Sequence, residues 1–125
     1  MTNKNLATVI RKDDVVEELV VLLINNIHVR CFLSYCPHPI EVGADYEVEL
    51  EIVLPDGEYA EEAEENRVGV KMIGEGFSCV LNGYLNDGTF SSFVDFHEQE
   101  IHFDYPNLNN KYIKVRADRI DVSIE

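Results

Sequence analysis

The chain has 125 residues, of which 46% are hydrophobic, and it carries 24 acidic against 10 basic side chains. Its formal charge of −14 repels nucleic acid and anionic membrane surfaces, so a partner chosen by charge should be basic. The length and apolar content suffice for one hydrophobic core, and we expect a single β domain over residues 1–125.

No segment of the sequence predicts export or membrane insertion. Residues 1–14 lack the apolar stretch of a secretion signal, and the longest apolar run, LVVLLI at residues 19–24, is far too short to cross a bilayer. The three cysteines form an odd number outside any dense framework, so structural disulfides are not expected. We therefore expect a soluble, cytoplasmic protein.

The first predicted element is a β-hairpin over residues 18–35. Apolar segments rich in β-branched residues flank Asn25 and Asn26, and asparagine tolerates the positive φ angles of a two-residue turn. The alternative is a helix over residues 13–24 with an aspartate as N-cap. Half of its last ten residues are β-branched, which favours the strand.

The end of this hairpin contains two cysteines and two histidines within eleven positions, namely His28, Cys31, Cys36 and His38. A zinc site requires ligands that converge on one point. Side chains alternate between the two faces of a strand, so Cys31 and Cys36 should point to opposite sides. We expect Cys31 and Cys79 to belong to the core, and we expect no bound metal or other cofactor.

Residues 44–54 show the clearest periodic pattern, because apolar side chains alternate there with glutamates. The pattern predicts a half-buried strand with Glu47, Glu49 and Glu51 in a row on its outer face. Alternate residues of a strand lie about 6 to 7 Å apart, roughly the spacing of successive phosphates. The row would therefore present negative charges much as a nucleic-acid backbone does.

The acidic charge is concentrated in residues 31–66, which contain eleven acids and no lysine or arginine. A Pro-Asp-Gly turn after the glutamate strand leads into helix-forming residues, and we expect a short acidic helix or loop near residues 57–66. The candidate partner-binding residues are Glu47, Glu49, Glu51, Glu58, Glu61, Glu62, Glu64 and Glu65.

The remaining residues predict further short strands separated by Gly and Asn turns. The expected strands cover residues 67–73, 77–85, 89–96, 100–105 and 111–125. We place a hairpin turn at Asp87-Gly88 and interpret Gly83 as a bulge or a close backbone approach. The expected fold is mainly β, all-β or a β-rich α+β, forming a small antiparallel barrel or sandwich for which an OB-like barrel is one option.

The sequence contains no catalytic signature. It has no G-x-S-x-G, no C-x-x-C and no phosphate loop. Glu100, His102 and Asp104 would share a strand face and could ligate a divalent cation, but alternation alone already requires polar residues there. We expect no catalytic residues and no enzymatic activity.

Three functions are compatible with these features. The first, which we favour, is a non-enzymatic domain whose acidic face binds a basic protein, as an immunity protein or inhibitor of a nuclease-type toxin would. The second is an OB-like nucleic-acid binder, for which the candidate residues are Tyr84, Phe90, Phe93, Phe96 and Tyr112 for stacking and Lys111, Lys114, Arg116 and Arg119 for phosphates. The third is a metal-dependent enzyme. The net charge makes nucleic acid and membranes the less expected partners.

Overall fold

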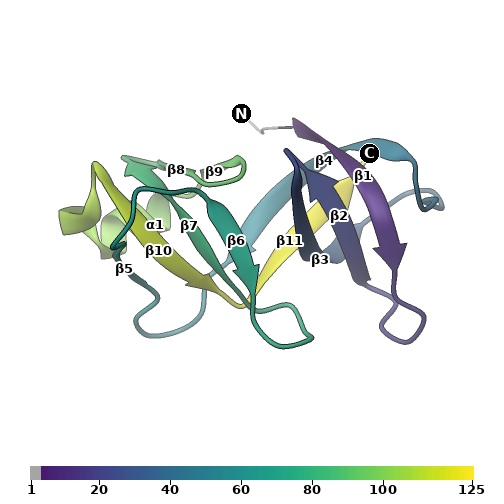
Figure 1. Ribbon diagram of the computed structural model, residues 1–125, viewed down its shortest axis with the longest axis horizontal. Helices are drawn as coiled ribbons and strands as arrows, with labels where there is room; N and C mark the ends of the chain where they lie inside the picture. The colour runs from purple at the N-terminus through teal and green to yellow at the C-terminus, as the bar shows by residue number, and fades with distance from the viewer. Residues whose placement is uncertain (1–3) are drawn as a thin grey trace.

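The computed structural model describes residues 4–125, which fold into eleven strands and one short helix (Figure 1). The first four strands are β1 (Lys4–Lys12), β2 (Leu19–Ile24), β3 (Ile27–Tyr35) and β4 (Asp45–Val53). The middle strands are β5 (Ala60–Glu62), β6 (Gly69–Met72), β7 (Cys79–Asn86), β8 (Thr89–Ser91) and β9 (Asp95–His97). The helix α1 (Gln99–Asp104) and the strands β10 (Lys111–Ala117) and β11 (Arg119–Ile124) complete the chain. The prediction of a mainly β fold is confirmed.

Five strands close into a barrel in the order β1-β2-β3-β11-β4, and β4 returns to pair with β1. All neighbours are antiparallel except β3 and β11, which run parallel. This is the strand number and order of an OB-type barrel, with the whole of residues 54–118 inserted before its last strand. Alternate side chains such as Val9, Leu22 and Val122 are fully buried inside it.

The hairpin predicted over residues 18–35 is confirmed. Strands β2 and β3 pair from Leu19↔Phe32 to Ile24↔Ile27, and the turn residues Asn25 and Asn26 have φ angles of 50° and 66°. The alternative helix is wrong, since its second half is strand β2. Strand β1 was not anticipated; it pairs with both β2 and β4 and closes the barrel.

A second sheet, in the order β5-β10-β7-β8-β9 with β6 also paired to β7, lies beside the barrel (Figure 1). The turn between β7 and β8 is at Asp87-Gly88, as predicted, with φ of 53° at Asp87. A Cβ atom on Gly83 would lie 2.4 Å from the carbonyl oxygen of Ser91. Gly83 therefore marks a close backbone approach, one of the two interpretations that its sequence context allowed.

The structure corrects the prediction of a strand over residues 100–105, because residues 100–104 belong to helix α1 and Tyr105 is its C-cap. Glu98 caps this helix, because its carboxylate accepts a hydrogen bond from the backbone N–H of Glu100 at 3.2 Å. Over so few residues, alternation of polar and apolar side chains does not distinguish a strand from a short helix. Here it is a short helix that buries one side chain, Ile101.

Three other element boundaries differ from the predictions. Near residues 57–66, of the helix or loop that was expected, the loop is found, and it is interrupted by the three residues of strand β5, which pairs with β10. Residues 89–96 contain two short strands rather than one. Residues 111–125 are interrupted at Asp118, where the chain leaves the second sheet as β10 and enters the barrel as β11.

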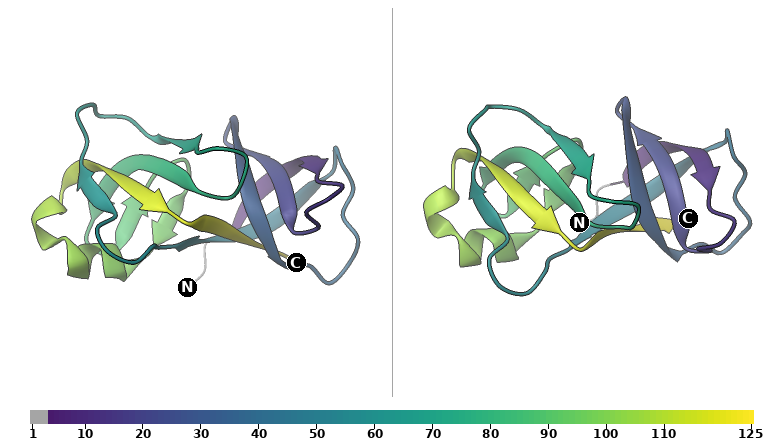
Figure 2. Two further views of the ribbon diagram at one scale, coloured as in Figure 1. Left: turned by 90° about the horizontal axis from the view of Figure 1, so that it is seen from below. Right: turned by 60° about the horizontal axis from the view of Figure 1, so that its bottom comes forward.

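The barrel and the second sheet are joined by β10 and β11, which follow each other across the molecule (Figure 2). The loop between β6 and β7 packs on the barrel: Phe77 contacts Phe32 on β3 with ring centroids 5.4 Å apart. The Arg30 guanidinium donates to the carbonyl oxygens of Gly74 and Gly76. Buried apolar residues of both parts belong to one continuous core. Across residues 4–125, none of the helical segments has the length and apolar character needed to cross a membrane.

Candidate functional site

The glutamate row lies on the outer face of strand β4, as predicted. Val48 and Ile52 point into the barrel and are buried, whereas Glu47 and Glu51 are exposed and Glu49 is half-buried. The two neighbouring strands extend this acidic face. We define the barrel acidic face as the outer side of β1, β4 and β11, with Glu47, Glu49, Glu51, Asp121 and Glu125 as its carboxylates.

Within residues 4–125, two cations form ion pairs with carboxylates of the barrel acidic face. Lys4 on β1 lies opposite Glu49 and forms an ion pair with Glu125 at 2.6 Å. The Glu125 carboxylate raises the pKa of the Lys4 ammonium group, with smaller contributions from Glu47 and Glu49. Arg119 binds Asp121 at 2.7 Å. The remaining carboxylates, including Glu47 and Glu51, make no ion pair within residues 4–125.

Exposed apolar side chains lie within this face. Leu6 on β1 is opposite Glu47 and is 65% exposed, and Ile10 on the same strand is 38% exposed. Large apolar groups surrounded by charged side chains are typical of protein-binding surfaces. The glutamate row of the barrel acidic face is therefore bordered on β1 by exposed apolar side chains.

The other five predicted partner-binding residues lie in a different place, at the edge of the second sheet. Glu62 on β5 approaches Lys111 at 3.4 Å, and Glu65 approaches Arg67 at 4.0 Å. Glu64 is exposed in the loop between β5 and β6, while Glu58 and Glu61 line a cleft described below. The eight glutamates thus form two separate groups rather than one surface.

The cysteines and histidines of residues 28–38 do not converge. Cys31 points into the barrel and is fully buried, while the Cys36 thiol donates to the carbonyl oxygen of His38 at 2.8 Å. Burial raises the pKa of Cys31 well above its ordinary range and that of Cys79 to about 11. Both are neutral thiols at physiological pH and weak nucleophiles. In the part of the chain that the structure describes, no three His, Cys, Asp or Glu side chains are grouped to hold a metal ion.

The predicted grouping of Glu100, His102 and Asp104 on one face depended on a strand and is wrong. In the helix Glu100 and Asp104, four residues apart, share one face, whereas His102 points in a different direction. Asp104 is instead a structural partner, because the Tyr59 hydroxyl donates to its carboxylate at 2.5 Å. Burial and this hydrogen bond raise the pKa of Tyr59, so α1 is held to the β4–β5 connection by a neutral tyrosine.

The aromatic residues suggested for base stacking are not displayed as a platform. Phe90, Phe93 and Phe96 are at most 5% exposed. Tyr84 and Tyr112 are half-buried and pack edge to face, with ring centroids 5.1 Å apart. The three phenylalanines therefore offer no exposed ring for base stacking, and the two tyrosines offer only part of theirs.

Part of the face that binds nucleic acid in OB-type barrels is also covered. That face is formed by the second and third strands of the barrel. On β3 the ring of Phe32 contacts the ring of Phe77. The guanidinium carbon of Arg119 lies 4.2 Å from the centroid of the same ring. Phe77, from the segment inserted before β11, therefore occupies part of this face.

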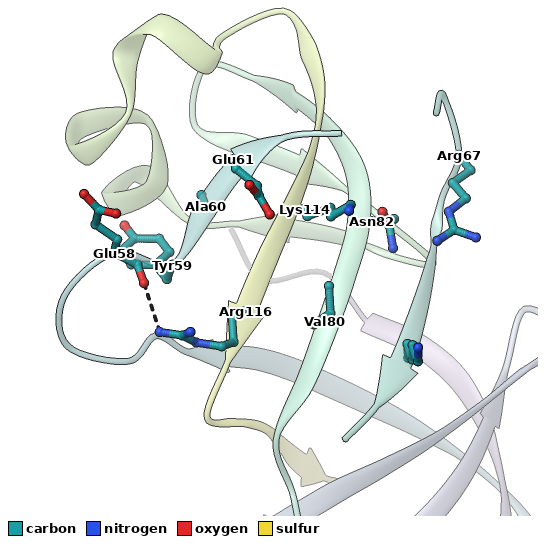
Figure 3. A pocket seen from close by; sticks show the side chains of 10 residues that line it. Glu58, Tyr59, Ala60, Glu61, Arg67, Val80, Asn82, Lys114 and Arg116 are labelled. Atoms are coloured by element: carbon teal, nitrogen blue, oxygen red, sulfur yellow. Dashed lines mark hydrogen bonds between the residues drawn. The ribbon is translucent and has the colours of Figure 1, made fainter. Parts of the chain in front are cut away.

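The basic residues of the C-terminal segment separate according to the sheet they occupy. Arg119 belongs to the barrel, whereas Lys114 and Arg116 share the open face of the second sheet, as their spacing predicted. Arg67 and Lys71 join them there to line a cleft of about 560 Å³ (Figure 3). The sequence did not identify this cleft, since its cations come from segments more than 40 residues apart, 67–71 and 114–116, which the pairing of β6, β7 and β10 brings together.

Comparison with known proteins identifies the family of this chain. No curated protein and no solved structure matches it. A family model described as uncharacterised conserved protein UCP019853 matches residues 2–125. This covers nearly the whole sequence and includes both the barrel and the second sheet. The chain therefore belongs to the family of uncharacterised conserved protein UCP019853.

Proposed function

We propose that this protein is a non-enzymatic, cytoplasmic binding protein whose barrel acidic face docks a basic protein partner. The observation that carries the proposal is the outward row of Glu47, Glu49 and Glu51 on one rigid strand, bordered by the exposed side chain of Leu6. Unpaired charges of one sign accelerate association with an oppositely charged partner. The exposed leucine supplies apolar area that such a contact would bury.

The class of partner follows from the geometry of the charges. Three carboxylates at alternate positions of one strand are spaced roughly like phosphates on a strand of nucleic acid, about 6 to 7 Å apart. A protein surface that binds phosphates would accept them. We therefore propose a nuclease-type basic protein as the partner, and inhibition or immunity as the role.

The test uses two variants that lose the same charge at different places. E47Q/E49Q/E51Q neutralises the row on β4, and E62Q/E64Q/E65Q neutralises three glutamates at the edge of the second sheet. Proteins retained from a lysate of the native cells by the immobilised protein are identified and purified. Their binding is then measured one to one, because retention from a lysate can be indirect.

We expect a basic protein whose direct binding weakens by at least about tenfold in the β4 variant and by less than about twofold in the second-sheet variant. Equal effects of the two variants would show that only the total charge matters. That result would refute the assignment of the barrel acidic face, as would the absence of any basic protein that binds directly.

A further inference from the structure

The cleft on the open face of the second sheet lies away from the barrel acidic face and is built for a different ligand. Side chains from β5, β6, β7 and β10 line it (Figure 3). Its volume of about 560 Å³ falls in the range of small-molecule sites, roughly 300 to 1,000 Å³. We propose that this cleft binds a small phosphate-bearing molecule that carries a hydroxyl group next to its phosphate.

Positive charge is concentrated in the cleft. Four of the ten basic residues of the chain, Arg67, Lys71, Lys114 and Arg116, line the cleft together with the carboxylates of Glu58 and Glu61. The lining thus has a formal charge of +2 on a chain of −14. Like charges brought together on a sheet oppose folding, and a bound anion would offset that cost.

The register of the strands explains how the cations meet. Arg116 on β10 lies opposite Val80 on β7, and Val80 lies opposite Lys71 on β6. Lys114, two residues before Arg116 on the same face, lies opposite Asn82. The two lysines and Arg116 therefore surround the pair formed by Val80 and Asn82, which makes the floor of the cleft.

The cations of the cleft are largely available to a ligand. Within residues 4–125, neither Lys71 nor Lys114 makes an ion pair. Arg67 has only a long contact of 4.0 Å with Glu65. Arg116 donates one hydrogen bond to the carbonyl oxygen of Glu58 at 3.0 Å and keeps further N–H groups, since a guanidinium has five.

Asn82 in the cleft also points to a ligand, independently of the charges. Its side chain is only 6% exposed, and its Oδ1 atom is buried without a hydrogen-bond partner in residues 4–125. A buried acceptor left unpaired is costly, and such atoms are rare unless water, an ion or a ligand supplies the missing hydrogen bond. A hydroxyl group of the ligand could donate a hydrogen bond to Oδ1 of Asn82. The phosphate of the same ligand would be held beside it by Lys71 and Lys114.

Size and charge favour a small molecule over a nucleic-acid strand. A strand of phosphates would have to approach a protein of net charge −14, which repels long polyanions. Glu58 and Glu61 lie at one side of the cleft (Figure 3) and would oppose a backbone continuing in that direction.

The test is a titration followed by amide NMR with three probes: ribose 5-phosphate, inorganic phosphate and a ten-nucleotide single strand. Two charge-matched variants are compared with the native chain. K71Q/K114Q removes two cations of the cleft, whereas K12Q/K111Q removes two lysines outside it. The amide spectrum of each free variant reports directly whether its fold is retained.

We expect ribose 5-phosphate to shift amide signals of β6, β7 and β10 and to bind more tightly than inorganic phosphate. K71Q/K114Q should weaken it by at least about tenfold, since two charge-assisted hydrogen bonds are lost, and K12Q/K111Q by less than about threefold. Asn82→Asp, which keeps the shape and adds a negative charge, should abolish binding.

Four outcomes would overturn the proposal. They are equal weakening by both double variants, shifts confined to other regions, no shift with either phosphate compound up to about 10 mM, and tighter binding of the single strand than of ribose 5-phosphate. The last result would assign the cleft to nucleic acid. None of these outcomes bears on the barrel acidic face, which shares no residue with the cleft.

Discussion

Glu51 on β4 and Asp121 on β11 lie directly opposite each other in an antiparallel pair of strands. Arg119 binds Asp121 at 2.7 Å but makes no ion pair with Glu51. Like charges at such positions destabilise a sheet, by several tenths of a kcal/mol. The protein therefore maintains negative charge on this face at a cost in stability, as expected for a surface used in binding.

This cost can be measured. Glu51→Gln should raise the free energy of unfolding by about 0.5 kcal/mol, as determined by urea denaturation at low salt. The control is Glu47→Gln, because Glu47 lies opposite Leu6 rather than an acid. The gain should shrink at high salt, which screens exposed charges. If the free energy of unfolding rose equally in both variants, the repulsion would come from the net charge of the protein and not from the pair of Glu51 and Asp121.

Phe77 connects the second sheet to the barrel by packing edge to face on Phe32, with an interplanar angle of 72°. Phe77→Ala should lower the free energy of unfolding by about 2 kcal/mol, because Phe77 is only half-buried and loses less than a core phenylalanine. Phe103→Ala removes the same atoms from a side chain that is 72% exposed and should cost under about 0.5 kcal/mol. Similar losses in the two variants would show that the Phe77 contact does not stabilise the junction.

Gly83 has no room for a side chain. A Cβ atom there would lie 2.4 Å from the Ser91 carbonyl oxygen, and backbone cannot move aside as a flexible side chain can. Gly83→Ala should lower the free energy of unfolding by about 2 kcal/mol or more. Gly76→Ala, at a glycine with no atom within 4 Å of such a Cβ, should change it by less than about 0.5 kcal/mol. A Gly83→Ala protein as stable as Gly76→Ala would contradict the close approach.

His38 makes stability depend on pH. Its Nδ1 lies 3.1 Å from the carbonyl oxygen of Pro39 and its Nε2 lies 3.1 Å from that of Glu125. Both acceptors favour the doubly protonated ring and raise the pKa of His38. The stabilisation is therefore complete below the unfolded-state pKa of 6.5 and is lost as the pH rises through the higher folded-state value.

We expect His38→Gln to lower the melting temperature below about pH 6 and to leave it nearly unchanged above about pH 8.5. His28→Gln, at an exposed histidine on β3, is the matched control and should show no such pH dependence. A loss in His38→Gln that is constant across this range, or larger at high pH, would contradict the bridging role of the ring.

The features that could be predicted from the sequence are those encoded by residues close together in the chain. The hairpin turn at Asn25 and Asn26 depends on two adjacent residues that tolerate positive φ, and the outward row from Glu47 to Glu51 depends on alternation within one strand. The pleat likewise placed Cys31 in the core. Because the tertiary structure agrees with these local patterns, the predictions made from them were correct.

The features that were missed depend on contacts between distant segments. Helix α1 alternates like a strand, and its state is decided by the Glu98 cap and by the bond between Tyr59 and Asp104, 45 residues apart. The cationic cleft requires the register of β6, β7 and β10. The sequence also predicted one acidic surface for two groups of glutamates, whereas the fold places them on different sheets. Proximity in sequence does not determine which sheet a residue joins.

The most direct test of the central claim is the association rate of the purified basic partner with the native protein, measured by stopped flow as a function of salt. If the barrel acidic face steers the encounter, the rate should fall steeply with salt, and E47Q/E49Q/E51Q should lower it by at least about tenfold at low salt. The equally charged E62Q/E64Q/E65Q should associate within about twofold of the native rate. Rates that are independent of salt, or equally slow in both variants, would contradict the assignment of partner binding to this face.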